Sequence, residues 1–280
     1  MRLATLKNNT AIAITKKGII PLNKIDFFGS IKDLIRIGEK KWEEISNNIN
    51  HAEDGISINK EEFAAPINDP SKIIGIGLNY SDHANETKMA LPKSPIVFAK
   101  FNNSINGPVD PIIIPTGITN QVDYEVELGV VIGKTAKNVS KENALDYVFG
   151  YTILNDVSAR DIQFSESQWV KGKSLDTFCP MGPVIVSWDE IQDPVNLEIG
   201  CKVNDVIMQQ GNTKDMIFGV AELISKLSQI FTLAPGDIIA TGTPSGVQYG
   251  KENPNYLKDG DIVTSWIKGI GEMINPVIEV

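Results

Sequence analysis

The segment VDYEVELGVVIG, residues 122–133, decides the fold. On a β-strand, side chains two positions apart share a face, so Glu125 and Glu127 project together while Val126 and Leu128 face the other way. Two carboxylates this close raise each other's pKa unless a cation neutralises them, and LGVVIG is too apolar for a freely solvated strand. The pattern predicts either a partly buried strand at a cation site or a strand with its acidic face in water.

Short β-rich runs, separated by Gly, Pro, Asn and Asp turns, make up most of the chain after residue 68. In this part, apolar residues at helical spacing occur only at 140–147 and 218–231. A regular alternation of strands and helices is missing, which argues against a doubly wound sheet. We therefore expect an α+β, β-rich protein in which residues 69–280 form a mixed β-roll. The predicted strands are KIIGIG, PIVFAK, PIIIP, VDYEVELGVVIG, VFGYTILND, GPVIVS, NLEIGCKVN, DIIATG and DIVTSWI.

Residues 1–68 are predicted to form a small α/β domain. LATLKNN and TAIAI flank a polar turn and predict a hairpin. Ser30 and Asp33 resemble a capping box at the start of one helix, which carries apolar residues from Leu34 to Ile45. The segment FAAPINDP contains two prolines and an Asn-Asp turn pair, and we place the domain boundary there. A chain of 280 residues is long enough for one large domain with such an appendage.

Charge and composition exclude several classes of function. Acidic residues outnumber basic ones, 35 to 26, and the lysines are scattered, which argues against a nucleic-acid or anionic-membrane partner. The start MRLATLKNNT lacks the apolar region of a signal peptide, and no apolar run approaches the roughly 20 residues of a membrane helix. Two distant cysteines outside a CxxC pattern support neither a disulfide framework nor a zinc knuckle. We expect a cytoplasmic protein.

A third carboxylate completes a candidate metal site. The apolar strand VFGYTILND delivers Asp156 to its C-terminal end, where it can converge with Glu125 and Glu127. Three hard oxygen ligands with open positions suit Mg²⁺ or Mn²⁺, with Ca²⁺ as a further possibility. Because the only histidines are His51 and His83, a three-histidine or HExxH zinc site cannot be built. Taken alone, Asp156 is more typical of a turn or a helix cap than of a metal ligand.

The segment IGIGLNYSDHANE contains a second candidate cluster. Gly75 and Gly77 follow an apolar strand, as in a dinucleotide fingerprint, but Tyr80 stands where the third glycine is needed. His83 and Glu86 are three residues apart, which places both on one face of a short helix or turn. A carboxylate beside an imidazole raises its basicity, as the activation of a water molecule requires. A surface His-Glu pair is the alternative.

Several polar residues near these motifs are candidates for binding a substrate. If Asp156 binds a metal, Arg160, Gln163 and Lys173 are placed to supply cationic and amide donors to a carboxylate. Thr243 lies in TGTPSG, a turn rich in hydroxyl and N–H groups that suits an anion. Taken singly, Arg160, Gln163 and Lys173 are more typical of solvated polar positions, and the segment with Thr243 is equally typical of a plain strand-to-turn transition. The prolines of MALPKSP indicate a loop after the His-Glu segment that is able to act as a lid.

Taken together, six segments resemble the fumarylacetoacetate hydrolase superfamily, in particular its compact members. They follow the family order and cover most of the chain from residue 70 onward. The resemblance implies a β-roll catalytic domain, a small N-terminal domain and a homodimer. Compared with the longer fumarylacetoacetases, this chain lacks the large N-terminal domain and a counterpart of a late acidic residue, which argues against fumarylacetoacetate as the substrate. The segments are IGIGLNYSDHANE, PIVFAKFNNSINGP, VDYEVELGVVIGK, YTILNDVSARDIQ, KGKSLDTFCPMGP and IIATGTPSGV.

The resemblance also implies a role for most of the candidate residues. In the family, a metal triad stands beside a water-activating dyad, a catalytic lysine, and an arginine and a glutamine on the substrate side. These roles fall in turn on Glu125, Glu127 and Asp156, on His83 and Glu86, on Lys173, and on Arg160 and Gln163.

The function implied by these roles is Mg²⁺-dependent hydrolysis of a C–C bond in a small 2,4-dioxo acid, such as an acylpyruvate or fumarylpyruvate. His83 with Glu86 would activate the water, while the metal and Lys173 stabilise a pyruvate enolate. The same site suits decarboxylation of oxaloacetate, interconversion of its keto and enol forms, or isomerisation of a 2-oxo diacid. A ureidoglycolate lyase and an inactive anion-binding module are the remaining alternatives.

Overall fold

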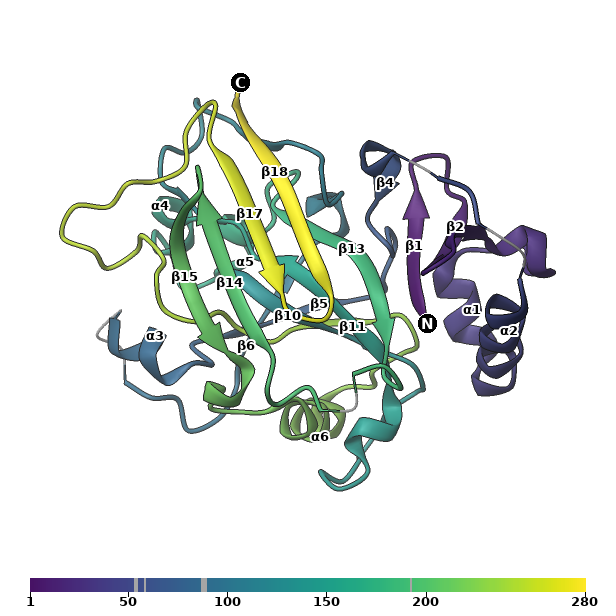
Figure 1. The fold of residues 1–280 in the computed structure, drawn as a ribbon. Helices are drawn as coiled ribbons and strands as arrows, with labels where there is room; N and C mark the ends of the chain where they lie inside the picture. Colours follow the sequence, from purple (N-terminus) through teal and green to yellow (C-terminus); the bar gives the residue numbers. More distant parts are fainter. Residues whose placement is uncertain (53–54, 58, 87–89, 192) are drawn as a thin grey trace.

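The computed structural model describes residues 1–52, 55–57, 59–86, 90–191 and 193–280 (Figure 1). Strands outnumber helices in these ranges, and the helices are short. The β-rich α+β class predicted from the sequence is therefore confirmed. The predicted lid loop lies partly outside the described residues.

A large mixed sheet runs through the centre of the molecule. Most neighbouring strands are antiparallel, whereas β16 is parallel to β5, and β7 to β13. This mixture of directions was predicted from the missing strand-helix alternation. In sheet order the strands are β3 (Gly18–Pro21), β2 (Ala11–Thr15), β1 (Arg2–Leu6), β13 (Cys179–Ser187), β11 (Val148–Asn155), β10 (Val126–Ile132), β16 (Ile238–Ala240), β5 (Ile73–Gly77) and β6 (Ile96–Lys100), with β4 (Phe63–Ala64) paired to β1 and β7 (Ile105–Asn106) to β13.

A second sheet packs on one face of the first, as seen in Figure 1, where β14, β17 and β18 lie in front of β10, β11 and β13. The core between the sheets contains Val126 and Leu128 of β10 together with Ile199 and Val263 of the second sheet. The alternation predicted for β10 thus sends its apolar residues into this core. Two strands of the second sheet, β15 and β18, were missed in the sequence. Its order is β15 (Val206–Asn212), β14 (Glu198–Val203), β17 (Ile262–Ile267), β18 (Gly271–Glu279) and β8 (Ile112–Ile114).

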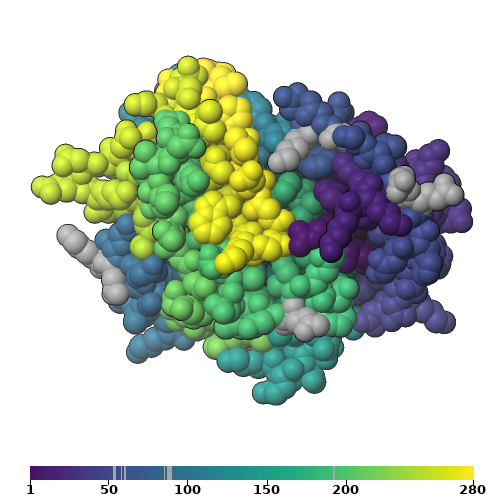
Figure 2. All heavy atoms as spheres, in the orientation of Figure 1, coloured from purple at the N-terminus to yellow at the C-terminus, as the bar shows by residue number. Residues whose placement is uncertain are grey.

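The N-terminal segment extends the large sheet. The predicted hairpin forms as β1 and β2, and β1 pairs with β13, so the sheet continues across the boundary expected near residue 68. Arg2 donates to the carbonyl oxygen of Gly269 at 2.7 Å, and Figure 2 shows the N-terminal residues against the C-terminal strands. The N-terminal segment and the rest of the chain therefore share one sheet.

The helix predicted to begin at Ser30 is in fact two helices. Ser30 and Asp33 form the expected capping box, but α1 (Ile31–Ile37) ends at Gly38, and α2 (Glu39–His51) follows. Gly38 has φ 100°, a conformation that favours glycine and interrupts the helix. The prediction of one continuous helix was wrong. The apolar residues keep helical spacing on both sides of Gly38, so their pattern did not reveal the interruption.

The remaining helices are short, apart from α6 (Val220–Ile230), which confirms the helix predicted at 218–231. The helix predicted at 140–147 is limited to the single 3₁₀ turn Ala144–Tyr147. No helix in the described part of the chain is both long and apolar enough to span a membrane. Around the site lie α3 (Ser81–Glu86), α4 (Arg160–Gln163), α5 (Val170–Lys173) and the two-stranded ladder of β9 (Val122–Asp123) with β12 (Ser158–Ala159).

Candidate active site

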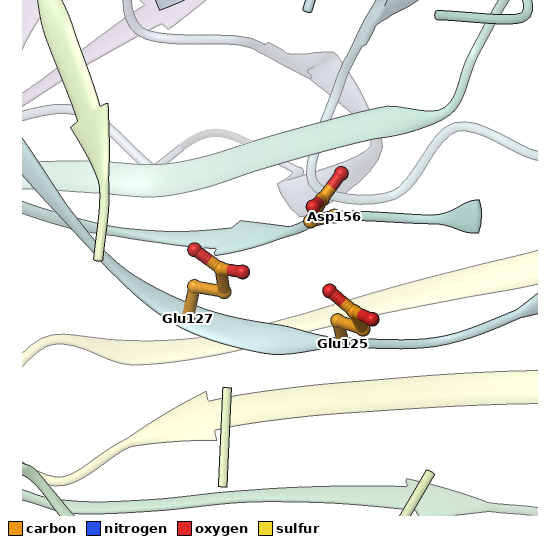
Figure 3. Close-up of side chains that lie close together, drawn as sticks. All are labelled: Glu125, Glu127 and Asp156. Carbon is orange, nitrogen blue, oxygen red and sulfur yellow. The ribbon is translucent and has the colours of Figure 1, made fainter. Parts of the chain in front are cut away.

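Three buried carboxylates converge where β10 and β11 meet (Figure 3). Glu127 lies on β10, Glu125 directly precedes that strand, and Asp156 directly follows β11. The antiparallel register places Val126 opposite Asn155, and the Asp156 N–H donates to the Glu125 carbonyl oxygen at 2.8 Å. One oxygen of each carboxylate lies within 4.8 Å of the others. The sequence prediction that these side chains converge is confirmed.

Buried cations neutralise two of the three carboxylates. Lys173 Nζ lies 2.8 Å from Glu125 Oε2 and 2.6 Å from Asp156 Oδ2, and Arg160 Nη1 lies 2.6 Å from Glu125 Oε1. Burial alone would raise the pKa of Glu125, but the charges of Lys173 and Arg160 hold it well below its usual value. Burial likewise opposes the charge of Lys173, while Asp156 and Glu125 raise its pKa. Lys173 and Arg160 therefore stabilise the ionised form of Glu125.

Glu127 is in the opposite situation. It accepts a hydrogen bond from the Gly242 N–H at 2.8 Å, but within the described residues no cation lies at ion-pair distance from it. Burial, with the nearby charges of Asp156 and Glu125, raises its pKa well above the usual value. A carboxylate in this position gains most from a bound cation. The donor set, made only of hard oxygens, fits Mg²⁺ or Mn²⁺.

A second lysine, which the sequence analysis missed, supports the triad. Lys100 ends the edge strand β6, yet its side chain is fully buried. Its ammonium lies 2.6 Å from Asp156 Oδ1 and 3.2 Å from the Val157 carbonyl oxygen, and it also donates to the Lys173 carbonyl oxygen. Because the preceding residues of β6 are largely exposed, alternation along the strand gave no sign of this burial.

Arg160 and Gln163, predicted to bind a substrate, are bonded to each other and to the protein. Arg160 Nη1 donates to Gln163 Oε1 at 2.9 Å, and Arg160 Nε donates to Asp123 Oδ2 at 2.9 Å. Asp123, which the sequence analysis passed over, also accepts from the N–H groups of Gln248 and Tyr249, each at 3.0 Å. The Arg160 guanidinium is therefore fixed in orientation before any ligand binds.

The predicted His-Glu pair forms at the edge of the same site. His83 Nδ1 lies 3.5 Å from Glu86 Oε2 on α3, in agreement with the expected shared helix face. His83 is buried and Glu86 half-buried. The Glu86 carboxylate also accepts a hydrogen bond from the Gly246 N–H at 3.0 Å, so the turn after β16 holds this carboxylate in place.

The turn that contains Thr243 binds the protein's own carboxylates. The Thr243 hydroxyl donates to the Val126 carbonyl oxygen at 2.8 Å and accepts from Gln209 Nε2 at 2.8 Å. The N–H groups of Gly242 and Gly246 are the donors to Glu127 and Glu86 described above. The predicted anion-binding character of this turn thus orients the triad and the dyad.

A cavity of about 30 Å³ connects these groups. Its polar lining consists of one carboxylate of the triad, the imidazole and the neighbouring cations and polar side chains. These residues are Glu125, His83, Arg160, Gln163, Lys173 and Thr243. A ligand in this cavity meets Glu125 of the triad, the two cations and the imidazole at once.

Comparison with known proteins supports an enzymatic site. A family model described as fumarylacetoacetate (FAA) hydrolase C-terminal matches residues 72–278. The chain is 52% identical over 249 residues to a fumarylacetoacetate hydrolase domain-containing protein 2 homolog from Dictyostelium discoideum, covering 85% of this chain and 81% of that protein. It is 44% identical over 250 residues to a mitochondrial oxaloacetate tautomerase from Xenopus laevis, covering 89% and 78%.

A solved structure shows the same fold around a metal. The chain matches maleylpyruvate hydrolase from Sphingobium sp. SYK-6, in complex with manganese(II) and pyruvate, with a TM-score of 0.83 and 31% identity. The match covers 100% of this chain and 99% of that one. A β-roll of this kind thus holds a divalent cation together with a small 2-oxo acid in a related protein.

Proposed function

The chain belongs to the fumarylacetoacetate hydrolase family, and from this we propose that it is a metal-dependent enzyme that interconverts the keto and enol forms of oxaloacetate. The observation that carries the proposal is a carboxylate triad whose member Glu125 lines a small cavity together with two cations and an imidazole. Oxaloacetate tautomerases are among the similar proteins, and oxaloacetate is a small 2-oxo diacid whose negative charges suit a cationic cavity.

Glu125, Glu127 and Asp156 would hold the divalent cation, Mg²⁺ or Mn²⁺. When bound, the cation supplies Lewis-acid polarisation of the 2-oxo group and its neighbouring carboxylate. The three carboxylates are the only described group of at least three potential ligands so arranged, and the ammonium of Lys173 touches two of them. The proposal therefore requires Lys173 to shift its contacts toward the substrate when the cation binds.

Lys173 and Arg160 would orient the acid. Both are nearly fully buried, where charge-assisted hydrogen bonds are strong. Asp123 fixes the plane of the Arg160 guanidinium, and Lys100 fixes the backbone at Lys173. The substrate would thus meet donors that need little further ordering, which is the main source of rate in preorganised sites.

His83 would move the proton. In the keto-to-enol direction a proton leaves C3 for the imidazole, and Lys173 Nζ gives a proton to the 2-oxo oxygen. The imidazolium then gives its proton to water and Lys173 takes one from water, so both groups return to their starting states; the reverse direction follows the same steps backwards. The composition of the acid is unchanged, as tautomerisation requires. Glu86 would support the charged imidazole from 3.5 Å.

Hydrolysis of a 2,4-dioxo acid is the second candidate, and the His83–Glu86 pair favours it. The same pair is suited to deprotonate a water, which would then attack the distal carbonyl carbon and release pyruvate and a second acid. The maleylpyruvate hydrolase among the similar structures lends support to this reaction.

One experiment separates these reactions. The protein is freed of metal, reloaded with Mg²⁺, and incubated separately with oxaloacetate, acetylpyruvate and fumarylpyruvate, while enol absorbance, CO₂ and pyruvate are followed. Tautomerisation speeds the approach of oxaloacetate to keto-enol equilibrium without CO₂ or pyruvate. Pyruvate from a dioxo acid would support hydrolase activity, and CO₂ would support decarboxylation. Failure to accelerate the enol equilibrium would exclude the proposed reaction.

We further propose a homodimer in the cytoplasm. The edge strand β6 carries exposed Ile96 and Val97, followed by Phe101, a surface that a second copy would cover. The two free cysteines, Cys179 and Cys201, are buried and suit a reducing compartment. A monomer in sedimentation equilibrium, or a tagged protein found in another compartment, would contradict these assignments.

A further inference from the structure

The glycines of IGIG resemble half of a dinucleotide fingerprint, but in this fold they have a packing role. Gly75 and Gly77 lie two residues apart on β5 and share a face. A Cβ atom at Gly75 would lie 2.3 Å from the ring of Phe98, and one at Gly77 would lie 2.5 Å from the ring of Trp169. Neither distance is tolerated, so the two glycines leave the space in which these rings are seated.

These two rings continue into a row of four. The ring centroids of Phe98 and Trp169 are 5.7 Å apart, those of Trp169 and Phe164 are 6.1 Å apart, and Phe164 stacks on Tyr249 at 4.2 Å. Such separations are typical of interacting aromatic pairs. We call this row, Phe98, Trp169, Phe164 and Tyr249, the aromatic wall. All four rings are half-buried.

The aromatic wall lies directly against the catalytic cations. The Lys173 ammonium is 5.1 Å from the Phe98 ring centroid, and the Arg160 guanidinium is 5.6 Å from that of Tyr249. All four rings line the cavity of about 30 Å³ that contains these cations. A substrate chain that extends beyond the polar part of this cavity therefore meets one of these rings.

The aromatic wall also separates the small cavity from a larger groove. Phe98 and Trp169 line a second, much larger groove of about 930 Å³ behind β5 and β6. Loss of the Trp169 ring would join the small cavity to this groove, whose outer lining includes Ile96, Val97 and Phe101 of the proposed dimer surface. The rings thus form the boundary that limits the length of a bound acid. The polar groups of the cavity pair with one another and do not form this boundary.

We propose that the aromatic wall, seated by Gly75 and Gly77, determines specificity by restricting the enzyme to short 2-oxo acids. This inference rests on the proposed function, because it requires the acid to bind beside the triad. It assigns the wall to the end of the substrate away from the cation, where a hydrophobic boundary separates acids by chain length.

Binding of linear 2-oxo acids to the Mn²⁺-loaded protein tests the proposal. Isothermal titration compares 2-oxobutanoate, 2-oxohexanoate and 2-oxooctanoate in the wild type, in Trp169→Ala and in Trp188→Ala, whose side chain is exposed and does not line the cavity. In the wild type, affinity should fall with chain length. Trp169→Ala should improve the affinity of the longest acid relative to the shortest by at least about tenfold, while Trp188→Ala keeps the wild-type profile.

Urea unfolding of the Mn²⁺-loaded protein tests separately whether Gly77 provides the space for the Trp169 ring. Gly77→Ala should lower the urea midpoint in the presence of Trp169 and leave it unchanged in the Trp169→Ala background, because its new Cβ conflicts with that ring. Gly117→Ala is the matched control, since a Cβ there meets nothing within 4 Å. Equal effects of Gly77→Ala in both backgrounds would contradict the seating.

The outcomes separate this inference from the proposed reaction. Parallel length profiles in the wild type and Trp169→Ala overturn the role of the wall even if oxaloacetate is tautomerised. A changed profile without tautomerisation refutes the reaction and supports the wall. If none of the acids binds to the loaded wild type, the role of the wall is refuted, and the oxaloacetate assay still decides the reaction by itself.

Discussion

The ammonium of Lys100 lies 2.6 Å from Asp156 Oδ1, on the opposite carboxylate oxygen from the one that Lys173 contacts. Both partners are fully buried. Asp156 is thereby held between two lysines, with one oxygen committed to Lys100 and the other directed into the site. The Lys100 ammonium also donates to the carbonyl oxygen of Lys173 and so holds the backbone there.

Substitution of Lys100 should therefore damage both stability and metal binding. In Lys100→Met the buried Asp156 carboxylate loses one partner, and such losses cost about 3–5 kcal/mol. Urea unfolding and Mn²⁺ titration measure the two effects. Lys171→Met is the control, because its pair with Glu166 is exposed and worth at most about 1 kcal/mol. A Lys100→Met protein as stable as this control would contradict the assignment.

The raised pKa of Glu127 makes the stability of the metal-free protein depend on pH. Above the unfolded value of 4.5, the folded state holds a proton that the unfolded chain has lost. The free energy of unfolding therefore falls as pH rises, until Glu127 ionises in the folded state. Saturating Mn²⁺ should abolish this fall, because the cation stabilises the ionised carboxylate.

Mn²⁺ binding should accordingly release protons, about one at the pH where metal-free Glu127 is still protonated. Calorimetric titration in two buffers of different ionisation enthalpy gives the number released. Glu127→Gln serves as the control, since it has no proton to lose at this position. Equal proton release in the wild type and in Glu127→Gln would be inconsistent with the account.

His83→Ala should separate chemistry from metal binding. We expect kcat to fall by about 10²–10⁴, the usual contribution of a general acid-base residue. Mn²⁺ affinity should be retained, because His83 is not one of the three carboxylates. His51→Ala, at the exposed end of α2, should behave as the wild type. Undiminished turnover in His83→Ala would remove the imidazole from the mechanism.

Metal removal should be reversible and should affect stability. EDTA should abolish turnover, and either Mg²⁺ or Mn²⁺ should restore it. At a cation concentration about 100 times Kd, the free energy of unfolding should rise by about 2.7 kcal/mol. Thermal unfolding with and without the cation checks this. An unchanged melting temperature at saturating Mn²⁺ would argue that the triad does not bind the ion.

The sequence predicted the parts of the site that follow from strand geometry. The two-residue period placed Glu125 and Glu127 on one face, and the end of an apolar strand indicated Asp156. Three-residue spacing likewise predicted the pairing of His83 with Glu86. Each of these relationships depends on a single segment or on two adjacent strands, so local pattern was sufficient.

The parts that were missed depend on tertiary packing. Lys100 is buried only because β6 ends against the loop after β11, and Asp123 acts through a turn more than 120 residues away in sequence. Gly38 broke a helix whose apolar spacing was otherwise regular. The use of Gly75 and Gly77 became evident only once Phe98 and Trp169 were seen beside them.

The central claim is most directly tested by the rate at which oxaloacetate reaches keto-enol equilibrium in one preparation of wild-type protein, first freed of metal and then reloaded with Mg²⁺, beside Glu127→Gln treated identically. The account predicts acceleration only in the reloaded wild type, with no CO₂ or pyruvate formed. Acceleration that persists without metal, or that is equal in Glu127→Gln, would contradict it.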